Sequence, residues 1–247
     1  MKKPKTVVKD KQSKFAYFLS KKVGKAITDY NMLDDKDRIL VAVSGGKDSF
    51  TLLKILNQRR SFVPIKYDIT AVHIDMGYRC IHPKILEKYF KQNGYQYHIE
   101  KIDILKNTPR EKITCFWCSW NRRKALFQTA EKLGCTKIAL GHHKDDIIQT
   151  FLLNLIFNGE ISAMNPKQEL FEGKINLIRP LAYVEERETE RFAKENNFPM
   201  PHCSCPNANN TKRAEVAKLI RKLEKMSPQF KTNVFRSLQR IKREYLV

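Results

Sequence analysis

The sequence predicts an α/β fold in which a doubly wound parallel sheet of five strands carries basic helices at both ends of the chain. The first observation is a wholly apolar run at 39–43, typical of a strand buried on both faces, which precedes a glycine turn and a helical pattern ending at 56. The second is a repeated alternation of strand and helix patterns along the chain. The third is a hydrophobic content of 42% over 247 residues, enough for one sizeable core.

The turn after the first strand is predicted to bind phosphate. It reads Ser44-Gly45-Gly46-Lys47-Asp48-Ser49. Glycines permit a sharp bend and a close approach to a ligand, and the helix that follows offers free N–H groups to an anion. The turn is not a GxxxxGK[ST] loop, because Val41 stands where that motif needs glycine. It resembles the PP-loop of the ATP pyrophosphatases, which cleave ATP between its α and β phosphates; the alternative is an ordinary Gly-Gly turn.

The remaining elements follow in order. Further strands are expected at 67–74, 95–102, 137–140 and 175–178, and further helices at 83–93, 119–133, 147–157 and 185–196. Residues 158–174 lack a period and are expected to form a loop. Ligands of open α/β sheets bind beyond the carboxyl ends of the strands, so His73 and Asp75 are expected near the nucleotide. The alternative for His73 is a buried, hydrogen-bonded strand residue.

Both ends of the chain are basic. Residues 1–30 hold nine lysines and two aspartates and show one amphipathic helical pattern. Residues 211–247 hold eleven basic and three acidic residues and show two such patterns. We therefore predict three parts: an N-terminal extension at 1–30, an ATPase domain at 31–200, and a cysteine-containing link with basic helices at 201–247.

The net charge of +21 favours a polyanionic partner, and nucleic acid is the commonest. The alternative is a proteome that is rich in lysine throughout. No run of eighteen apolar residues occurs and the N-terminus lacks the apolar core of a signal peptide, so we expect a cytoplasmic protein without a membrane span.

A second candidate site, Gly141-His142-His143-Lys144-Asp145-Asp146, lies between a strand and a helix. Two carboxylates beside a phosphate site make sense if Mg²⁺ bridges them to the nucleotide, or if they orient a nucleophile. The alternative is that acidic residues merely favour the positive end of a helix dipole.

The cysteines form a third candidate site. Cys115 and Cys118 make a CxxC, and two more cysteines, Cys203 and Cys205, lie far along the chain. In a cytosolic protein such a set indicates a metal or catalysis. Three thiolates can hold a four-iron–four-sulfur cluster with one iron open, and zinc with three cysteines and His202 is the competing interpretation. Of the remaining two, Cys135 is expected in the core and Cys80 receives no role.

These motifs together resemble the tRNA 2-thiocytidine synthetase family over about 39–215. The similar stretches are 44–49, the CxxC with Arg122 and Arg123 four and five residues after its second cysteine, 136–147, and Ile178 to Tyr183. The resemblance implies a PP-loop, iron–sulfur enzyme that adenylates C2 of cytidine 32 in the tRNA anticodon loop and replaces its oxygen with sulfur. Cys205 is preferred over Cys203 as the third ligand, because proline follows it and Lys212-Arg213 lies at the expected spacing.

The resemblance assigns ATP, Mg²⁺ and a 4Fe-4S cluster as cofactors, and tRNA and a sulfur donor such as a cysteine desulfurase as partners. Whether the chain forms a homodimer is left open. The catalytic candidates are Lys47, Asp48, Arg122, Asp145 and Asp146, where Arg122 has the alternative of an RNA-facing basic surface. The nucleotide-binding candidates are Ala42, Ser44, Gly45, Gly46, Lys47, Ser49, His73, Asp75 and Gly141, and the cluster candidates are Cys115, Cys118 and Cys205.

Three other functions compete with this interpretation. A lysidine-synthetase-type PP-loop ligase needs no cluster, so the CxxC counts against it. A sulfonucleotide reductase has a similar loop, but the motif at 141–146 and the basic ends fit it poorly. A non-enzymatic zinc or iron–sulfur RNA-binding protein would leave the phosphate turn and the aspartate pair unexplained.

Overall fold

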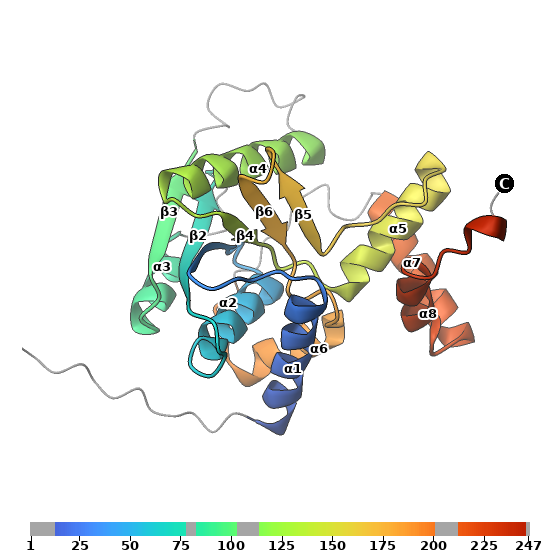
Figure 1. Ribbon diagram of the computed structural model, residues 1–247, viewed down its shortest axis with the longest axis horizontal. Helices are drawn as coiled ribbons and strands as arrows, with labels where there is room; N and C mark the ends of the chain where they lie inside the picture. The colour runs from blue at the N-terminus through green and yellow to red at the C-terminus, as the bar shows by residue number, and fades with distance from the viewer. Residues whose placement is uncertain (1–12, 78–82, 103–113, 201–211, 246–247) are drawn as a thin grey trace, which may run out of the picture.

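A mostly parallel six-stranded sheet organises the molecule, in the strand order β3-β2-β1-β4-β6-β5 (Figure 1). The computed structural model describes residues 13–77, 83–102, 114–200 and 212–245. The strands are β1 (Asp37–Ala42), β2 (Tyr67–Asp75), β3 (Tyr97–Lys101), β4 (Lys137–Ala139), β5 (Lys167–Leu170) and β6 (Ile175–Ile178). The predicted α/β class is confirmed.

Helices alternate with these strands and then close the chain. They are α1 (Lys14–Asp29), α2 (Lys47–Arg59), α3 (Pro83–Gln92), α4 (Cys115–Lys132), α5 (Lys144–Asn158), α6 (Glu186–Glu195), α7 (Lys212–Met226), α8 (Phe230–Ser237) and the short 3-10 turn η2 (Arg243–Tyr245). None of the helices in the described part of the chain is long and apolar enough to cross a membrane.

The sheet differs from the expected five parallel strands by one edge strand. β5 lies within 158–174, the stretch expected to be a loop, and pairs antiparallel with β6, Lys167 opposite Ile178 and Leu170 opposite Ile175. The prediction missed β5 because three of its four residues are polar and the strand has only one neighbour, so no apolar period marks it.

The strand order creates a crevice at the centre of the sheet. The chain runs outward from β1 through β2 to β3, then returns to place β4 on the other side of β1. Such a reversal leaves the loops after the two central strands diverging on opposite sides, and ligands of open α/β sheets bind there. The phosphate turn follows β1 and the aspartate pair follows β4, so the fold brings the first two candidate sites together.

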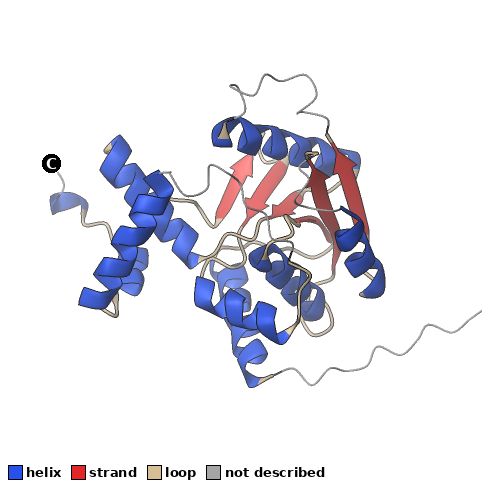
Figure 2. Cartoon of the chain, turned by 180° about the vertical axis from the view of Figure 1, so that it is seen from behind, coloured by secondary structure: helices blue, strands red, loops and turns tan. Residues whose placement is uncertain are grey.

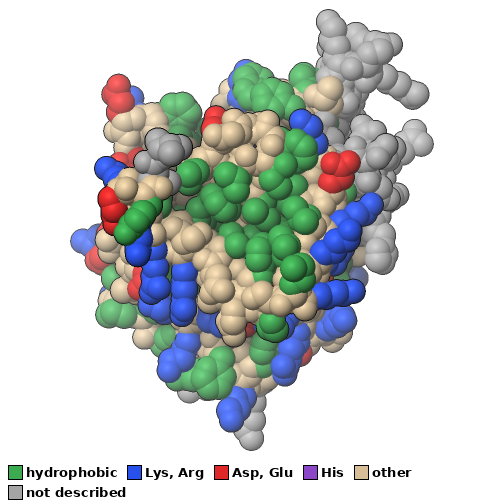
Figure 3. Space-filling model, turned by 90° about the vertical axis from the view of Figure 1, so that its right-hand side faces the viewer, with side chains coloured by type: hydrophobic (Ala, Val, Ile, Leu, Met, Phe, Trp, Pro, Cys, Tyr) green, Lys and Arg blue, Asp and Glu red, His purple; other side chains and the backbone are tan. Residues whose placement is uncertain are grey.

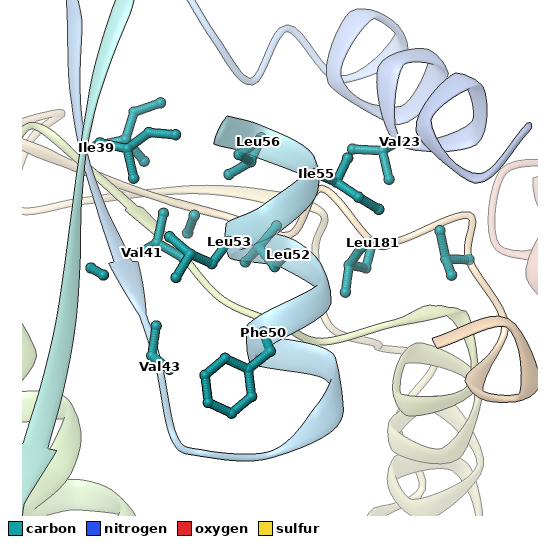
Figure 4. Packing of buried hydrophobic residues seen from close by; sticks show 14 of the residues in the cluster. Val23, Ile39, Val41, Val43, Phe50, Leu52, Leu53, Ile55, Leu56 and Leu181 are labelled. Carbon is teal, nitrogen blue, oxygen red and sulfur yellow. The ribbon is translucent and has the colours of Figure 1, made fainter. Parts of the chain in front are cut away.

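Helices cover both faces of the sheet (Figure 2). On one face, α2 packs its apolar side on β1, with Leu53 and Leu56 facing Val41 and Ile39 (Figure 4). On the other face, Ala125, Leu126 and Ala130 of α4 pack in a second cluster. β1 contributes to both clusters, since its side chains alternate between the two faces. A strand buried on both sides fixes the position of the turn that follows it.

The helix at the start of the described chain packs against this core. Leu19, Val23 and Ala26 of α1 are buried in the cluster that contains α2, and Arg59 of α2 donates to the Ser20 carbonyl at 2.8 Å. The boundaries drawn at residues 30 and 200 stay a prediction.

The last helices form a third cluster with α5. Ile148 and Leu152 of α5 are buried with Val216 and Ile220 of α7 and Phe235 of α8. On the face that these helices build, apolar side chains gather and Lys and Arg side chains flank them (Figure 3). Two amphipathic helices were expected here, and both are present.

Candidate active site

The phosphate turn has the backbone of an anion cradle. Gly45 has φ 91°, a left-handed conformation that side chains other than glycine rarely adopt. Gly46 is the N-cap of α2 and no side chain of the described residues caps that end, so the first N–H groups of the helix remain available to a ligand. Ser44 Oγ accepts a hydrogen bond from the Gly46 N–H at 3.3 Å, and Ser49 Oγ donates to the Gly46 carbonyl at 2.8 Å.

Gly141 joins the two central loops. A Cβ atom placed on Gly141 would lie 3.0 Å from the Ser49 nitrogen and 3.1 Å from the Asp48 carbonyl carbon. Glycine is therefore required here for close backbone packing. This contact fixes the end of β4 against the first turn of α2.

Lys47 and Asp48 lie in a polar network with α6. Lys47 Nζ is 2.9 Å from Glu186 Oε1 and 3.4 Å from Asp48 Oδ2. Burial lowers the pKa of Lys47, but Asp48 and Glu186 outweigh it and the pKa is raised overall. Thr189 donates to Asp48 Oδ1. Both side chains are thus held at the mouth of the cradle with Lys47 charged.

The end of β2 contributes His73 and Asp75. His73 is 3% exposed and its Nδ1 lies 2.8 Å from the Val43 carbonyl, so Nδ1 is the protonated nitrogen and Nε2 is an acceptor. Burial lowers the pKa of His73, which keeps the ring neutral. His73 is thus the buried, hydrogen-bonded strand residue of one interpretation. It also lines the cavity described below, as a residue near the nucleotide would.

The two aspartates of α5 point to different surroundings. Asp146 Oδ2 accepts from the His143 N–H at 3.1 Å in a capping box, and Asp146 lines the cavity. Asp145 has its two oxygens on the Glu186 N–H at 2.8 Å and on Lys231 Nζ of α8 at 2.5 Å. Burial raises the pKa of Asp145, but these partners outweigh it and the pKa is lowered.

One cavity of about 970 Å³ joins most of the predicted residues. It spans the ends of β1, β2, β4 and β6 and one side of α4. Its lining includes the predicted residues Ala42, Ser44, Gly46, Asp48, Ser49, His73, Asp75, Arg122, Gly141 and Asp146. Three other predicted residues lie beside the cavity and do not line it. They are Gly45 and Lys47 of the phosphate turn, and Asp145 of the aspartate pair.

The CxxC lies on the first turn of α4, whose cap is Thr114. Cys118 is half-buried, and the next residue, Ser119, lines the cavity. One turn on, Arg122 Nε donates to Met76 Sδ at 3.3 Å. Cys203, Cys205 and Cys80 lie outside the described residues. Within the described ranges no group of three His, Cys, Asp or Glu side chains could hold a metal.

Sequence reasoning missed several residues of the site. Glu186 and Thr189 reach Lys47 and Asp48 from α6, and Arg179 lines the cavity at the end of β6. From the tail, Lys231 pairs with Asp145, and Arg213 Nη2 lies 3.8 Å from Asp146. Arg179 and Arg213 had a signal, since both lie in stretches that the family resemblance uses. The roles of Glu186, Thr189 and Lys231 depend on contacts between distant parts of the chain.

Comparison with known proteins adds independent findings. The PP-loop domain family model matches residues 15–223. A tRNA-cytidine(32) 2-sulfurtransferase from Herminiimonas arsenicoxydans is 44% identical over 234 residues, which cover 93% of this chain and 74% of that protein. One of the same name from Geobacter sulfurreducens is 42% identical over 231 residues, 91% of this chain and 90% of that protein.

A solved structure is similar over nearly the whole chain. It is the U34-tRNA thiolase NcsA from Methanococcus maripaludis with its [4Fe-4S] cluster, with a TM-score of 0.76 at 25% identity. The similarity covers 94% of this chain and 80% of that one.

Proposed function

The chain belongs to the PP-loop family of the tRNA-cytidine(32) 2-sulfurtransferases, and we infer that it uses ATP to replace the C2 oxygen of cytidine 32 in a tRNA anticodon loop with sulfur. The observation that carries this proposal is a single cavity. This cavity is bordered by the uncapped N-terminus of α2, by Asp146 of α5 and by the side of α4 that follows the CxxC.

In the first half of the reaction, the C2 oxygen of cytidine attacks the α phosphorus of ATP and pyrophosphate leaves. The α2 N–H groups and Lys47 stabilise the charge that grows on the phosphates. His73 and Asp75 would border the nucleoside, because they end the strand beside β1. In the second half, hydrosulfide attacks C2, and AMP departs with the former C2 oxygen.

Magnesium fits the carboxylates that line the cavity. Mg²⁺ is usually held by one or two carboxylates together with substrate phosphates. Asp48 and Asp146 line the same cavity as the cradle and can supply those carboxylates. Asp145, with both oxygens on protein donors, is better suited to hold α6 and α8 in place. This refines the proposal that both aspartates are catalytic.

Two of the three proposed cluster ligands lie at the start of α4. Cys115 and Cys118 are three residues apart on a helix, which places their Cα atoms on the same side of its first turn. Cys205 is proposed as the third ligand. A cluster held by these three cysteines would supply an iron with an open position for sulfide. Arg122, one helical turn beyond Cys118, lines the cavity and is proposed to orient the reacting groups.

The physiological setting is also proposed. The excess of 47 basic over 26 acidic residues suits tRNA as the macromolecular substrate. We propose a cytoplasmic enzyme that receives sulfur from a donor such as a cysteine desulfurase.

The test is a reaction of anaerobically purified protein with ATP, sulfide and tRNA. We expect AMP, pyrophosphate and 2-thiocytidine, the last identified after digestion of the tRNA to nucleosides. Lys47→Ala and Asp48→Ala should lower AMP formation about 100-fold or more, because each removes a charge beside the cradle. Lys66→Ala, an exposed lysine before β2, is the matched control. Release of ADP and phosphate by the wild type would contradict the proposal.

A further inference from the structure

Arg179 lies immediately after β6, at the end of the cavity away from β2. The residue is 7% exposed, and its Nη1 donates to the Asn165 carbonyl. Its backbone N–H donates to the Pro166 carbonyl at 2.9 Å. The side chain is therefore held in a fixed position on the cavity wall.

Among the described residues, the rest of the guanidinium has no hydrogen-bond partner. Its Nε is shut off from solvent and has no hydrogen-bond acceptor among the described residues. Burial lowers the pKa of Arg179 to about 10, so the group stays charged at neutral pH. Asp146 offsets part of that charge and Arg123 adds to it, but no carboxylate in the described part of the chain forms an ion pair with Arg179. Buried cations are normally paired, so the charge of Arg179 favours an anion in the cavity that this residue lines.

The surroundings suit a nucleotide. His142 Nδ1 is a second buried nitrogen without a partner among the described residues. Burial lowers the pKa of His142 to about 4, so the ring that lines this wall is neutral. Gln168 and Phe171 line the same wall, and the exposed ring of Phe171 offers a surface for base stacking.

This end of the cavity is separate from the ATP cradle. β4 lies between β1 and β6, and neighbouring strands are about 4.8 Å apart, so the end of β6 lies about 10 Å from the end of β1. The ATP phosphates have their own donors at α2, and the nucleoside side of ATP is expected toward β2. A second nucleotide can therefore occupy the β4–β6 end while its base reaches toward the α phosphate.

We propose that the β4–β6 end of the cavity binds the target nucleotide of the RNA, and that Arg179 binds the RNA phosphate adjoining the target cytidine. This inference rests on the proposed function. A planar, charged guanidinium on the cavity wall matches phosphate oxygens, and phosphate contacts fix the position of a nucleic acid. A loop base turned out of its stack would be held by its backbone while C2 meets ATP.

The test is a thermodynamic cycle between protein and RNA. The RNA is an anticodon stem-loop in which one phosphate adjoining cytidine 32 is replaced by an uncharged methylphosphonate, on its 5′ or its 3′ side. Binding to the intact enzyme is measured by fluorescence anisotropy, and kcat and KM for both substrates are measured in parallel. Arg179→Gln should weaken RNA binding about tenfold, and Arg179→Lys less, while KM for ATP and iron content stay unchanged.

One of the two methylphosphonates should weaken wild-type binding about as much as Arg179→Gln, and should cost the variant nothing further. Arg60→Gln, at the far end of α2, should retain the full methylphosphonate effect. If Arg179→Gln and each methylphosphonate weaken RNA binding independently, so that their effects multiply, the inference is overturned. A variant that binds RNA normally but shows a raised KM for ATP, or weaker inhibition by pyrophosphate, would overturn it as well. If the wild type binds the stem-loop and forms no 2-thiocytidine, the proposed function fails while the binding cycle still decides the role of Arg179.

Discussion

At the scale of single residues, His73 connects the electrostatics of the site to stability. Its ring is buried and neutral, and burial holds its pKa below the ordinary 6.5. The unfolded chain therefore binds a proton more readily than the folded one as pH falls below 6.5, and the folded state loses stability in that range. We expect the melting temperature of the wild type to fall between pH 7 and pH 5.

His73→Gln removes this titration, so its melting temperature should fall less over the same range. The measurement is thermal unfolding at several pH values above 5, where most carboxylates remain ionised in both states. His98→Gln, which replaces a half-buried histidine on β3, serves as the comparison. Parallel curves for the wild type and His73→Gln would remove His73 as the source of the pH dependence.

The local sequence was sufficient to predict the position of residues whose conformation depends on the neighbouring backbone. The turn at 44–49 and Gly141 were predicted because a glycine turn between strand and helix is a local pattern. Glu186 and Lys231 were not, because each acquires its role from a residue distant in the sequence, Lys47 and Asp145 respectively. Side-chain partners across such distances depend on the packing of whole elements.

At the scale of elements, the start of α4 was expected four residues later than it occurs. The helix begins at Cys115 and not near Ser119, because Thr114 accepts a hydrogen bond from the Trp117 N–H and caps it. The CxxC therefore lies on a helical turn. β5 was missed for a related reason, since tertiary pairing with β6 and not its own pattern makes it a strand.

We predict that Cys115→Ala, Cys118→Ala and Cys205→Ala each abolish iron and sulfide binding in anaerobically purified protein. Cys135→Ala should leave both unchanged, because Cys135 is 6% exposed in the core and burial raises the pKa of its thiol. Iron content and the visible spectrum are the readouts. Loss of iron in Cys203→Ala with retention in Cys205→Ala would move the third ligand to Cys203.

The outer surface of α7 is expected to bind the RNA backbone. Lys218, Lys222 and Lys225 are exposed on this helix, whereas Val216 and Ile220 are buried against α5. Reversing the three lysines to glutamate should weaken tRNA binding and lower the slope of log affinity against log salt, by up to about 3 if each lysine neutralises one phosphate. ATP binding and iron content should not change. An unchanged affinity at two salt concentrations would make this surface a solvated one without a role in binding.

At the scale of the whole molecule, the basic tail is tied to the site through α5. Lys231 of α8 reaches Asp145, and Lys144 Nζ lies 3.2 Å from Thr232 Oγ1. From α7, Arg213 Nε donates to Gln149 Oε1 at 2.7 Å. The basic helices of the tail, which are proposed to contact RNA, thus also hold the helix that carries Asp146. Composition indicated a basic tail, but only the tertiary arrangement places it against the aspartate pair.

Variants of the ion pair between Lys231 and Asp145 can distinguish a structural role of Asp145 from a catalytic one. The two side chains are 19% and 13% exposed, and burial raises the pKa of Asp145 when its partners are removed. Lys231→Met should therefore lower the free energy of unfolding by about 3 kcal/mol, since it leaves a buried carboxylate without its cation. Thermal and denaturant unfolding of the full chain measure this loss.

The double variant Lys231→Met with Asp145→Asn removes the unpaired charge, so it should recover most of the lost stability. Because Asp145 does not line the cavity, we expect AMP formation to recover with it. Asp146→Asn, which changes the neighbouring carboxylate that does line the cavity, should keep the fold and lose AMP formation. A double variant that is stable and inactive would show that Asp145 acts in the chemical step, and would return both aspartates to the catalytic set.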